Sequence, residues 1–308
     1  MSEESRNIPD GMMEPSKADT SKTPGPGPMG RHHMAWLVVF PAAFLLIVFF
    51  LIPMFVALRY SLLSTMPFFD PNPSYTLANY IRVLTEPIYL RSFTRTAGYA
   101  ATATTISLVI SYPVAYYLAR EARRGGLILL VMLIPFWTSI ILRVFSWKII
   151  LGSSGIINSL LKTMGLIDLP AQLLYNRTGI IFGLVYTYTP FMILPLYATL
   201  GKVPQELLEA SEDLGWNKIQ TLWRVTLPLT RSGTMSAVIL VLLACFGDVL
   251  SAQMLGGANT LMISSVIFET FMGGANWNVG SALSVIVFGA LLLLAAVLTW
   301  LGREVEHV

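Results

Sequence analysis

Residues of the types that carry catalysis are sparse and scattered in this chain of 308 residues. A phosphate-binding loop follows the pattern G-x-x-x-x-G-K-S/T, in which backbone N–H groups surround a phosphate and the lysine reaches it. Here Gly201-Lys202 is followed by Val203, and Leu196 occupies the position of the first glycine. The glycine-rich stretch 152–155 contains no lysine. The sequence therefore predicts that this chain does not itself hydrolyse ATP.

The sequence also lacks the residue spacings that are typical of a metal site or of a catalytic nucleophile. His32 and His33 are adjacent, so a helix would point them in different directions, and we interpret them as part of a flexible tail. Cys245 is the only cysteine, which excludes an intrachain disulfide, and it lies in an apolar run that favours simple packing. No Ser/His/Asp or His/Glu metal spacing occurs. We therefore predict no catalytic residue, no metal site and no cofactor bound by this chain.

Two carboxylates in or beside apolar runs are candidates for contact with a cargo. Asp248 follows Phe246-Gly247, and Glu269 lies between the last two apolar runs. Charge within a bilayer is costly and usually faces a cavity or a partner, so both are plausible contacts for a cation. The alternative for Asp248 is that it caps a helix end or pairs with Arg143 or Lys148.

Four aromatic residues are further candidates along a path, because an amine binds the face of an aromatic ring. The alternative is packing, or a place in the aromatic belt at the membrane interface. These residues are Trp137, Trp147, Tyr186 and Tyr188.

The elements that must position these side chains are predicted to be membrane helices. Hydrophobic residues make up 55% of the chain and charged residues 12%, against about 25% charged in soluble domains. Mean hydropathy is +0.66. A spanning helix needs about 20 apolar residues. Six runs approach that length, and the third extends to 142 or to 151: 36–58, 97–119, 127–142, 178–200, 233–255 and 281–301. The fold class expected is an all-α polytopic membrane protein with six transmembrane helices.

Charge predicts which side of the membrane each segment occupies, because cytoplasmic segments carry an excess of Lys and Arg. Twelve of these residues lie in the segments that share a side with both termini, which are therefore expected in the cytoplasm. The other eight belong to the opposite side: Arg59, Arg82, Arg91, Arg95, Arg143, Lys148, Lys162 and Arg177. The basic residues form no clustered patch, so no nucleic acid is expected as a partner.

The chain is expected to divide into four parts. Residues 1–35 are polar and rich in Pro, Gly and Ser, which is typical of a disordered tail. Residues 36–95 hold the first span and an outer segment with an amphipathic surface helix at 77–84. Residues 96–302 hold the other spans, and 303–308 form a cytoplasmic tail.

A polar island between the fourth and fifth runs, 201–231, predicts a helix–turn–helix on the cytoplasmic surface. In its first helix, Leu207, Ala210, Ser211 and Leu214 share one face, with small residues at the centre. The opposite face is acidic, and holds Glu206, Glu209 and Asp213. Pro204 suits the first turn, and Gly215 suits the left-handed residue that ends a helix.

A second helix of this island is expected to begin with Asn217 as its cap. Its apolar face would hold Ile219, Leu222, Trp223 and Thr226, and Pro228 would end it. The small face of the first helix favours close approach by another protein surface.

The spacing across this island resembles a known motif. Glu209-Ala210-Ser211, three residues, Gly215, nine residues and Val225-x-Leu227-Pro228 match the EAA loop of ABC importer permeases, with Ser211 and Val225 as the two departures. In that family the loop is the coupling helix that fits a groove on a cytoplasmic ATPase; the alternative is a generic cytoplasmic helix pair. The resemblance implies these coupling residues: Glu206, Leu207, Glu209, Ala210, Ser211, Gly215, Leu227 and Pro228.

The resemblance extends from about Ala97 to Leu301, which is similar to the type 1 permease domain of binding-protein-dependent importers. Within that family it most resembles the PotB-type permeases of spermidine/putrescine importers, while permeases for opines and aminophosphonates look similar. The stretches that carry this resemblance include 135–138, 143–147, 189–195 and 247–248.

The resemblance implies a MetI-like fold in a bacterial inner membrane and a permease subunit rather than an enzyme. It also implies partners: an ATPase dimer that binds ATP and Mg²⁺, a second, PotC-like permease and an extracytoplasmic binding protein, all beside membrane lipid. The competing class is a stand-alone, ion-coupled secondary transporter, which needs inverted repeats and broken helices at the midplane. The EAA-like spacing has no role in that class.

Overall fold

The computed structural model describes residues 40–304, apart from 42, 67, 69 and 275. The chain divides into two units, Met1–Met54 and Phe55–Val308, and each is described by itself. The predicted tail at 1–35 lies outside the described residues. In the first unit, residues 43–46 are α-helical and lead into the π-turn η1 (Ile47–Leu51) and the start of α2 (Ile52–Ser61). Its apolar side chains are exposed, as suits a helix surrounded by lipid.

Helix α4 (Pro87–Arg120) is the longest element of the second unit and begins with a proline, which suits a first helical turn. Its buried face is made of small and hydroxyl residues at intervals of three and four: Ala100, Ala103, Thr104, Ser107 and Ser111. Small residues let helix backbones approach closely within a membrane. Helix α8 (Arg177–Leu200) packs along this face.

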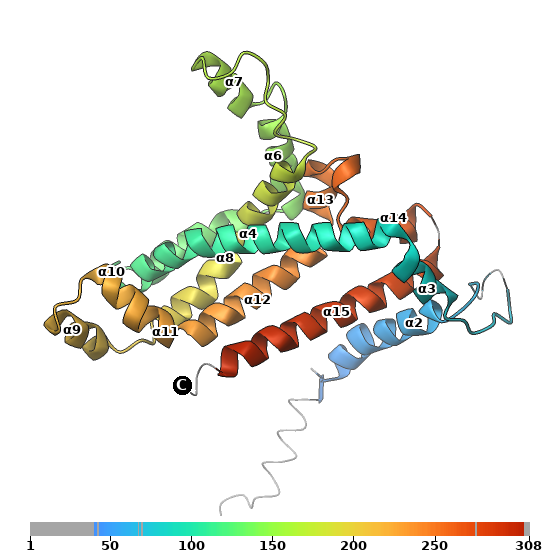
Figure 1. Ribbon diagram of the computed structural model, residues 1–308, viewed down its shortest axis with the longest axis horizontal. Helices are drawn as coiled ribbons and strands as arrows, with labels where there is room; N and C mark the ends of the chain where they lie inside the picture. The colour runs from blue at the N-terminus through green and yellow to red at the C-terminus, as the bar shows by residue number, and fades with distance from the viewer. Residues whose placement is uncertain (1–39, 42, 67, 69, 275, 305–308) are drawn as a thin grey trace, which may run out of the picture. The chain divides into compact units, whose positions relative to one another are not determined.

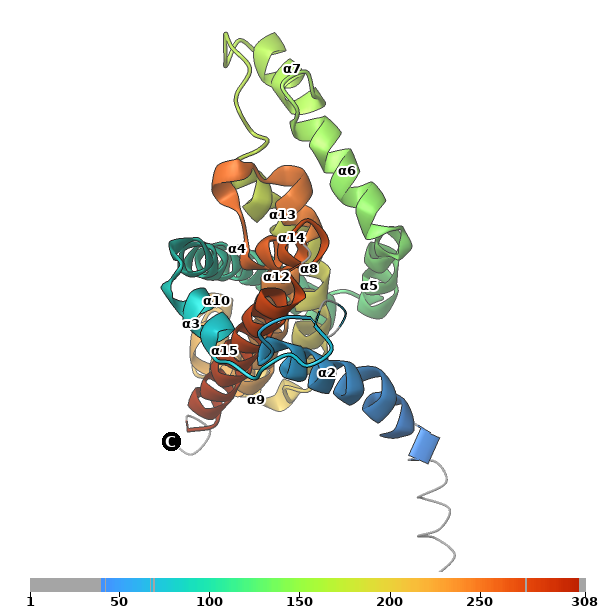
Figure 2. The same cartoon turned by 90° about the vertical axis from the view of Figure 1, so that its right-hand side faces the viewer.

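Two further long helices, α12 (Arg231–Gly247) and α15 (Trp277–Glu304), complete the core of this unit. Helix α12 contacts both α4 and α8, and α15 packs on α12. Figures 1 and 2 show these four helices side by side. The core includes Ala237, Val241 and Cys245, all fully buried, so the only cysteine is a packing residue.

The third apolar run forms three helical pieces instead of one span. Helix α5 (Gly125–Leu133) leads into the 3₁₀ turn η2 (Ile134–Trp137) and then α6 (Ile140–Leu151), followed by α7 (Ile156–Thr163). Pro135 lies in the break, where its missing N–H interrupts the helical bonding. The hairpin from α4 to α5 requires Gly125, because a Cβ there would lie 1.8 Å from the carbonyl oxygen of Leu118.

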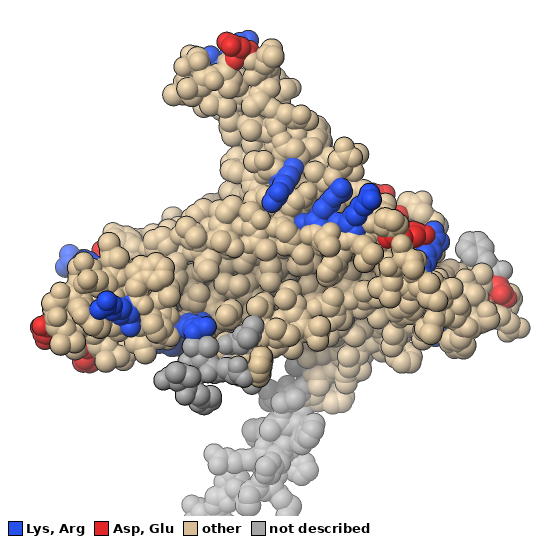
Figure 3. Space-filling view, in the orientation of Figure 1, with Lys and Arg blue, Asp and Glu red and all other residues tan. Residues whose placement is uncertain are grey.

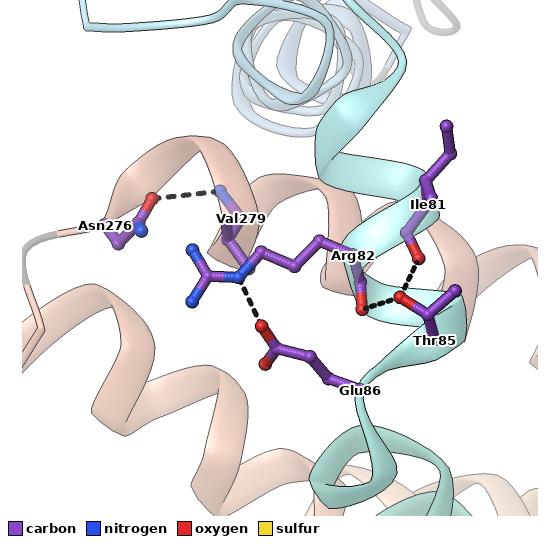
Figure 4. Close-up of polar contacts among 6 residues, drawn as sticks. All are labelled: Ile81, Arg82, Thr85, Glu86, Asn276 and Val279. Atoms are coloured by element: carbon purple, nitrogen blue, oxygen red, sulfur yellow. Dashed lines mark hydrogen bonds and ion pairs between the residues drawn. The ribbon is translucent and has the colours of Figure 1, made fainter.

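The predicted amphipathic surface helix is confirmed as α3 (Ala78–Thr85). Arg82 and Glu86 form an ion pair of 2.6 Å at its end, and α15 begins beside them (Figure 4). This pairing raises the pKa of Arg82 through the hydrogen bond to Glu86. Asn79 and Asn278 both donate to the carbonyl oxygen of Leu63, at 2.9 and 2.7 Å, which fastens the loop before α3 to the start of α15.

The fifth apolar run is broken, so the prediction of one continuous span over 233–255 is wrong. Helix α12 ends at Gly247, and α13 (Leu250–Leu255) starts after Asp248. The turn η4 (Ala258–Thr260) and α14 (Ile263–Met272) follow, and α14 carries Glu269. The sixth run is confirmed as α15, which begins earlier than residue 281.

The all-α prediction is confirmed: the described residues are mostly helical and contain no strand beyond a single bridge between Leu63 and Tyr75. Within them, four helices are long and apolar enough to span a membrane, and a bent pair would make a fifth. Helix α4 is not among these four because its middle is rich in Ala, Thr, Ser and Tyr. The count of six spans and the side of the termini therefore stay predictions.

Charged side chains are unevenly spread over this unit. On the face that Figure 3 shows, they gather over α9–α11, at the tip formed by α7, and along the upper edge from the base of α6 toward α3 and the start of α4. The lower middle of this face is almost free of charge, as the apolar core of a bilayer requires.

Candidate functional site

The predicted helix–turn–helix is present between α8 and α12. Helix α9 (Gln205–Asp213) is followed by α10 (Lys218–Thr221), the π-turn η3 (Leu222–Thr226) and α11 (Leu227–Leu229). We call residues 201–231 the coupling loop. Its two helices meet at a tight turn, and the turn residues set the angle between them.

Gly215 has φ of +79°, the left-handed conformation that favours glycine. The backbone N–H of Gly215 donates to the carbonyl oxygen of Glu212 at 2.8 Å, and the backbone N–H of Trp216 donates to the carbonyl oxygen of Ser211 at 3.1 Å. This pair of bonds is the Schellman ending of a helix. Asn217 then caps α10 and forms a capping box with Gln220. The predictions for Gly215 and Asn217 are both confirmed.

Ser211 lies at the contact between the two helices. Its side chain is only 3% exposed, and its hydroxyl shares a hydrogen bond of 2.8 Å with Thr221 on α10. Leu208 is buried on the same side. The predicted docking face of Leu207, Ala210, Ser211 and Leu214 is therefore wrong in one member, because Ser211 points into the loop.

The outward surface of the coupling loop is apolar with an acidic border. Ala210 is exposed at its centre, and the carboxylates of Glu206, Glu209 and Asp213 are exposed on the same helix. Leu214 is 72% exposed and Trp223 is 65% exposed. We call the exposed apolar residues of this surface the docking face: Leu207, Ala210, Leu214, Ile219 and Trp223.

The side chains of the second helix also face different directions from those predicted. Thr226 is buried and Leu222 packs against the core, while Ile219 and Trp223 face outward. The expectation that all four share one apolar face is therefore wrong. The π-turn at 222–226 adds a residue to the helical repeat and changes which side chains share a face.

Pro228 does not end the second helix. It lies within α11, and the chain turns by 74° between this helical segment and α12. Thr230 stands at the bend, where its hydroxyl meets the Tyr112 hydroxyl of α4 at 3.0 Å. Leu227 packs against the core, and Pro228 is exposed. The bend fixes how the coupling loop joins the fifth apolar run.

Asp248 lies at the break between α12 and α13 and is 5% exposed. Its carboxylate accepts from the N–H and the hydroxyl of Ser251, at 2.8 and 2.9 Å, so it caps α13. Arg143 and Lys148 do not pair with it; they lie over the rings of Phe136 and Tyr175, at 4.9 and 5.7 Å. The capping alternative is confirmed.

Of the predicted path residues, only Tyr188 lies close enough to Asp248 to influence its carboxylate. Trp147 packs between Phe182 and Tyr186, with ring centroids 4.5 and 5.1 Å away.

The other two predicted path residues are exposed. Trp137 is 85% exposed on η2, and Glu269 is exposed on α14 with Gln253 3.5 Å away. Within the described part of the chain, none of the hydrogen bonds, ion pairs or ring contacts joins Trp137, Trp147 or Glu269 to Asp248 or Tyr188.

The part of the chain that the structure describes contains no group of three or more His, Cys, Asp or Glu residues placed to hold a metal ion. A cavity of about 330 Å³ between α4, α5 and α8 is almost wholly apolar, and Phe136, Val185 and Ile193 are in its lining. Such a lining does not suit a polar solute.

The sequence is similar to those of known membrane proteins. Residues 111–307 match the model of a family described as the binding-protein-dependent transport system inner membrane component. The chain belongs to this family. This permease is 37% identical to the spermidine/putrescine transport system permease protein PotB of Escherichia coli K12, over 71% of this chain and 81% of that protein. It is 38% identical to PotB of Haemophilus influenzae, over 78% and 84%.

Solved structures support the fold. The permease matches a chain of a bacterial alginate ABC transporter, solved in complex with an alginate pentasaccharide-bound periplasmic protein, with a TM-score of 0.72 at 15% identity, over 90% of this chain and 96% of that one. It matches a chain of the MetNI methionine ABC transporter with a TM-score of 0.53 at 17% identity, over 70% and 95%. The MetI-like fold expected from the sequence is therefore confirmed. The chain is a multi-pass permease subunit of an ABC importer, not the subunit that hydrolyses ATP.

Sequence reasoning missed two residues that shape this site. Thr221 holds Ser211 in place, and Arg120 contacts the start of the coupling loop. Thr221 lies ten residues after Ser211, a spacing that no single helical period predicts. Arg120 is one of the twelve basic residues that the charge pattern assigns to the cytoplasmic side, and its position at the end of an apolar run places it beside the ends of neighbouring helices.

Proposed function

We propose that this permease carries a polyamine of the putrescine/spermidine class across a bacterial inner membrane. The observation that supports this cargo is the similarity to PotB, which extends over more than two thirds of both chains. Permeases for opines, aminophosphonates and other small polar solutes are the alternatives within the same architecture.

The docking face fits an ATPase subunit. It is exposed, apolar at its centre and bordered by carboxylates, and the only small residue on it is Ala210, which lets another surface approach the backbone of α9. The coupling residues on this side are Glu206, Leu207, Glu209 and Ala210. The other coupling residues lie outside the docking face and contribute by setting the shape of the loop: Ser211, Gly215, Leu227 and Pro228.

The remaining partners follow from the family. A second, PotC-like permease encloses the path together with this chain, and an extracytoplasmic binding protein delivers the cargo. ATP and Mg²⁺ bind to the ATPase dimer. ATP binding closes the dimer, the coupling loop moves with it, and the spans switch between inward-facing and outward-facing states as rigid bodies.

Asp248 and Tyr188 are the best placed path residues for a cationic cargo. A buried carboxylate attracts an ammonium group strongly because the surroundings screen charge poorly. The helix break at Asp248 gives this carboxylate a position that can change when α12 and α13 move relative to each other. Glu269, Trp137 and Trp147 are further candidates, each at a separate place.

The test is stimulation of ATPase activity by loaded binding proteins. The permease is co-expressed with its ATPase and the second permease, and hydrolysis is measured with the binding protein loaded with putrescine, spermidine, an opine or an aminophosphonate. Stimulation by the polyamine-loaded protein supports the proposal. Stimulation by another loaded protein keeps the architecture and replaces the cargo, and solute transport without an ATPase overturns the importer assignment.

A further inference from the structure

We propose that Arg120 and Glu121, two adjacent residues at the cytoplasmic end of α4, hold the coupling loop at its entry and at the start of its second helix, and that α4 therefore moves with the loop. This inference rests on the proposed function, in which the coupling loop is displaced by an ATPase. It names the helix that receives the displacement and the side chains that transmit it.

Arg120 holds the entry of the coupling loop. One terminal nitrogen of its guanidinium donates to the carbonyl oxygens of Leu200 and Val203. Leu200 is the last residue of α8, where the final carbonyls lack partners within the helix and attract a cation. A single side chain of α4 therefore fixes both the end of α8 and the turn that leads into α9.

Glu121 holds the start of the second helix of the loop. Its carboxylate pairs with the Lys218 ammonium at 2.9 Å, and Lys218 is the first residue of α10. Both side chains are largely exposed, so this pair contributes less than the contact of Arg120. The hydrogen bond to Glu121 raises the pKa of Lys218, which stays charged at neutral pH.

Helix α4 can carry a displacement across the membrane. It has 34 residues, which at 1.5 Å per residue is about 51 Å. Pro113 lies inside the helix without ending it, and the neighbouring Tyr112 is braced by Thr230. The helix is therefore continuous from the coupling loop to its far end.

In its outer part, α4 contacts the region of the helix break. The Thr96 hydroxyl oxygen accepts from the N–H of Ile263 at 2.7 Å, and Ile263 is the first residue of α14. The next residue, Ser264, donates to the carbonyl oxygen of Asp248 at 2.8 Å. These buried contacts connect α4 to the break between α12 and α13, so the coupling loop and the break at Asp248 are both fastened to the same continuous helix.

The test uses the assembled transporter with a reporter on the outer part of α4. Thr94→Cys places a thiol at an exposed position near the outer end of α4, while the native Cys245 is fully buried. The rate of modification by a membrane-impermeant maleimide is measured with and without a non-hydrolysable ATP analogue. This readout needs no cargo. Uptake of spermidine per ATP hydrolysed is measured in parallel.

In the parent, the nucleotide is expected to change the labelling rate. Arg120→Gln should abolish that change and lower cargo moved per ATP about tenfold, a common size for coupling between sites. Arg120→Lys keeps the charge with fewer donors and should give an intermediate loss. Glu121→Lys and Lys218→Glu should each weaken the response, and the double exchange should restore it. Arg123→Gln is the matched control, since this exposed arginine follows within the same turn.

The outcomes separate the two proposals. A nucleotide response in Arg120→Gln equal to that of the parent overturns the role of Arg120, as does a parent whose labelling never responds to nucleotide. A normal response without spermidine uptake overturns the polyamine cargo and leaves the role of Arg120 intact. A merely structural role would lower assembly with the ATPase in every variant, and rescue by the double exchange would contradict it.

Discussion

The hydroxyl groups of Ser211 and Thr221 share a hydrogen bond of 2.8 Å that joins the two helices of the coupling loop. Ser211 stands where the EAA pattern has its third small residue, and the contact gives this departure a physical reason. The hydroxyl is almost fully buried and also donates to the carbonyl oxygen of Leu208 at 2.6 Å. The loop therefore keeps its shape through a polar contact inside it.

Ser211→Ala should loosen the coupling loop. It leaves the buried Thr221 hydroxyl without this partner, at a cost of about 1–3 kcal/mol. The expected result is a lower melting temperature and weaker association with the ATPase, measured by co-purification. Ser211→Ala with Thr221→Val should cost less than the sum of the two single changes, and Ser236→Ala, at an exposed hydroxyl, should be neutral. Additive costs would contradict a direct contact.

Ala210→Trp should separate ATP hydrolysis from transport without unfolding the spans. Ala210 is exposed at the centre of the docking face, so the larger ring has room in the free subunit but blocks close approach by a partner. The expected result is an unchanged melting temperature with loss of ATPase co-purification. Ala210→Ser is the conservative control and should keep the complex. Unchanged transport in Ala210→Trp would mean that this face does not dock.

Gly215→Ala should destabilise the turn between α9 and α10. A residue with a Cβ pays about 1–2 kcal/mol in the left-handed conformation. No atom lies within 4 Å of a Cβ added at Gly215, so the cost arises from the backbone alone. Gly98→Ala is the matched control, since its Cβ also meets nothing but the position is helical, and it should be neutral or stabilising. Equal effects at the two positions, seen by thermal unfolding, would contradict this account.

Asp248→Asn separates the capping role from a role in cation binding. The asparagine oxygen can still accept from the N–H of Ser251, so stability should fall by less than about 1 kcal/mol, whereas Asp248→Ala loses the cap at about 1–2 kcal/mol. If the carboxylate also meets the cargo, Asp248→Asn should lower spermidine uptake at least tenfold, while the exposed Glu269→Gln serves as a comparison. Full uptake in Asp248→Asn would restrict Asp248 to its structural role.

Sequence patterns predicted the elements with strong local signals. The fourth apolar run at 178–200 is α8, and the left-handed Gly215 and the cap at Asn217 were both predicted, because each depends on residues next to it in the chain. The break in the fifth apolar run also has a local signal in the sequence. Asp248 precedes Ser251 by three residues, which is the spacing of a helix cap inside an otherwise apolar run.

Relationships between elements were not predictable in the same way. The inward position of Ser211 depends on Thr221 in another helix, and the π-turn at 222–226 shifts the face of that helix. Helix α4 can contain many hydroxyl side chains because these bond to carbonyl oxygens within the bundle. For example, the Ser111 hydroxyl donates to the carbonyl oxygen of Thr189 at 3.2 Å. The six path candidates were chosen by residue type alone, as carboxylates and aromatics, and the contacts of Trp137, Trp147 and Glu269 are with other residues than Asp248 and Tyr188.

Uptake of radiolabelled spermidine into proteoliposomes tests the central claim most directly. The vesicles contain this permease, its ATPase and the second permease, with loaded binding protein outside and ATP inside. Accumulation that requires ATP, requires the binding protein and stops with Ala210→Trp is the predicted result. Accumulation driven by an ion gradient through this chain alone, with no ATPase present, would contradict the account.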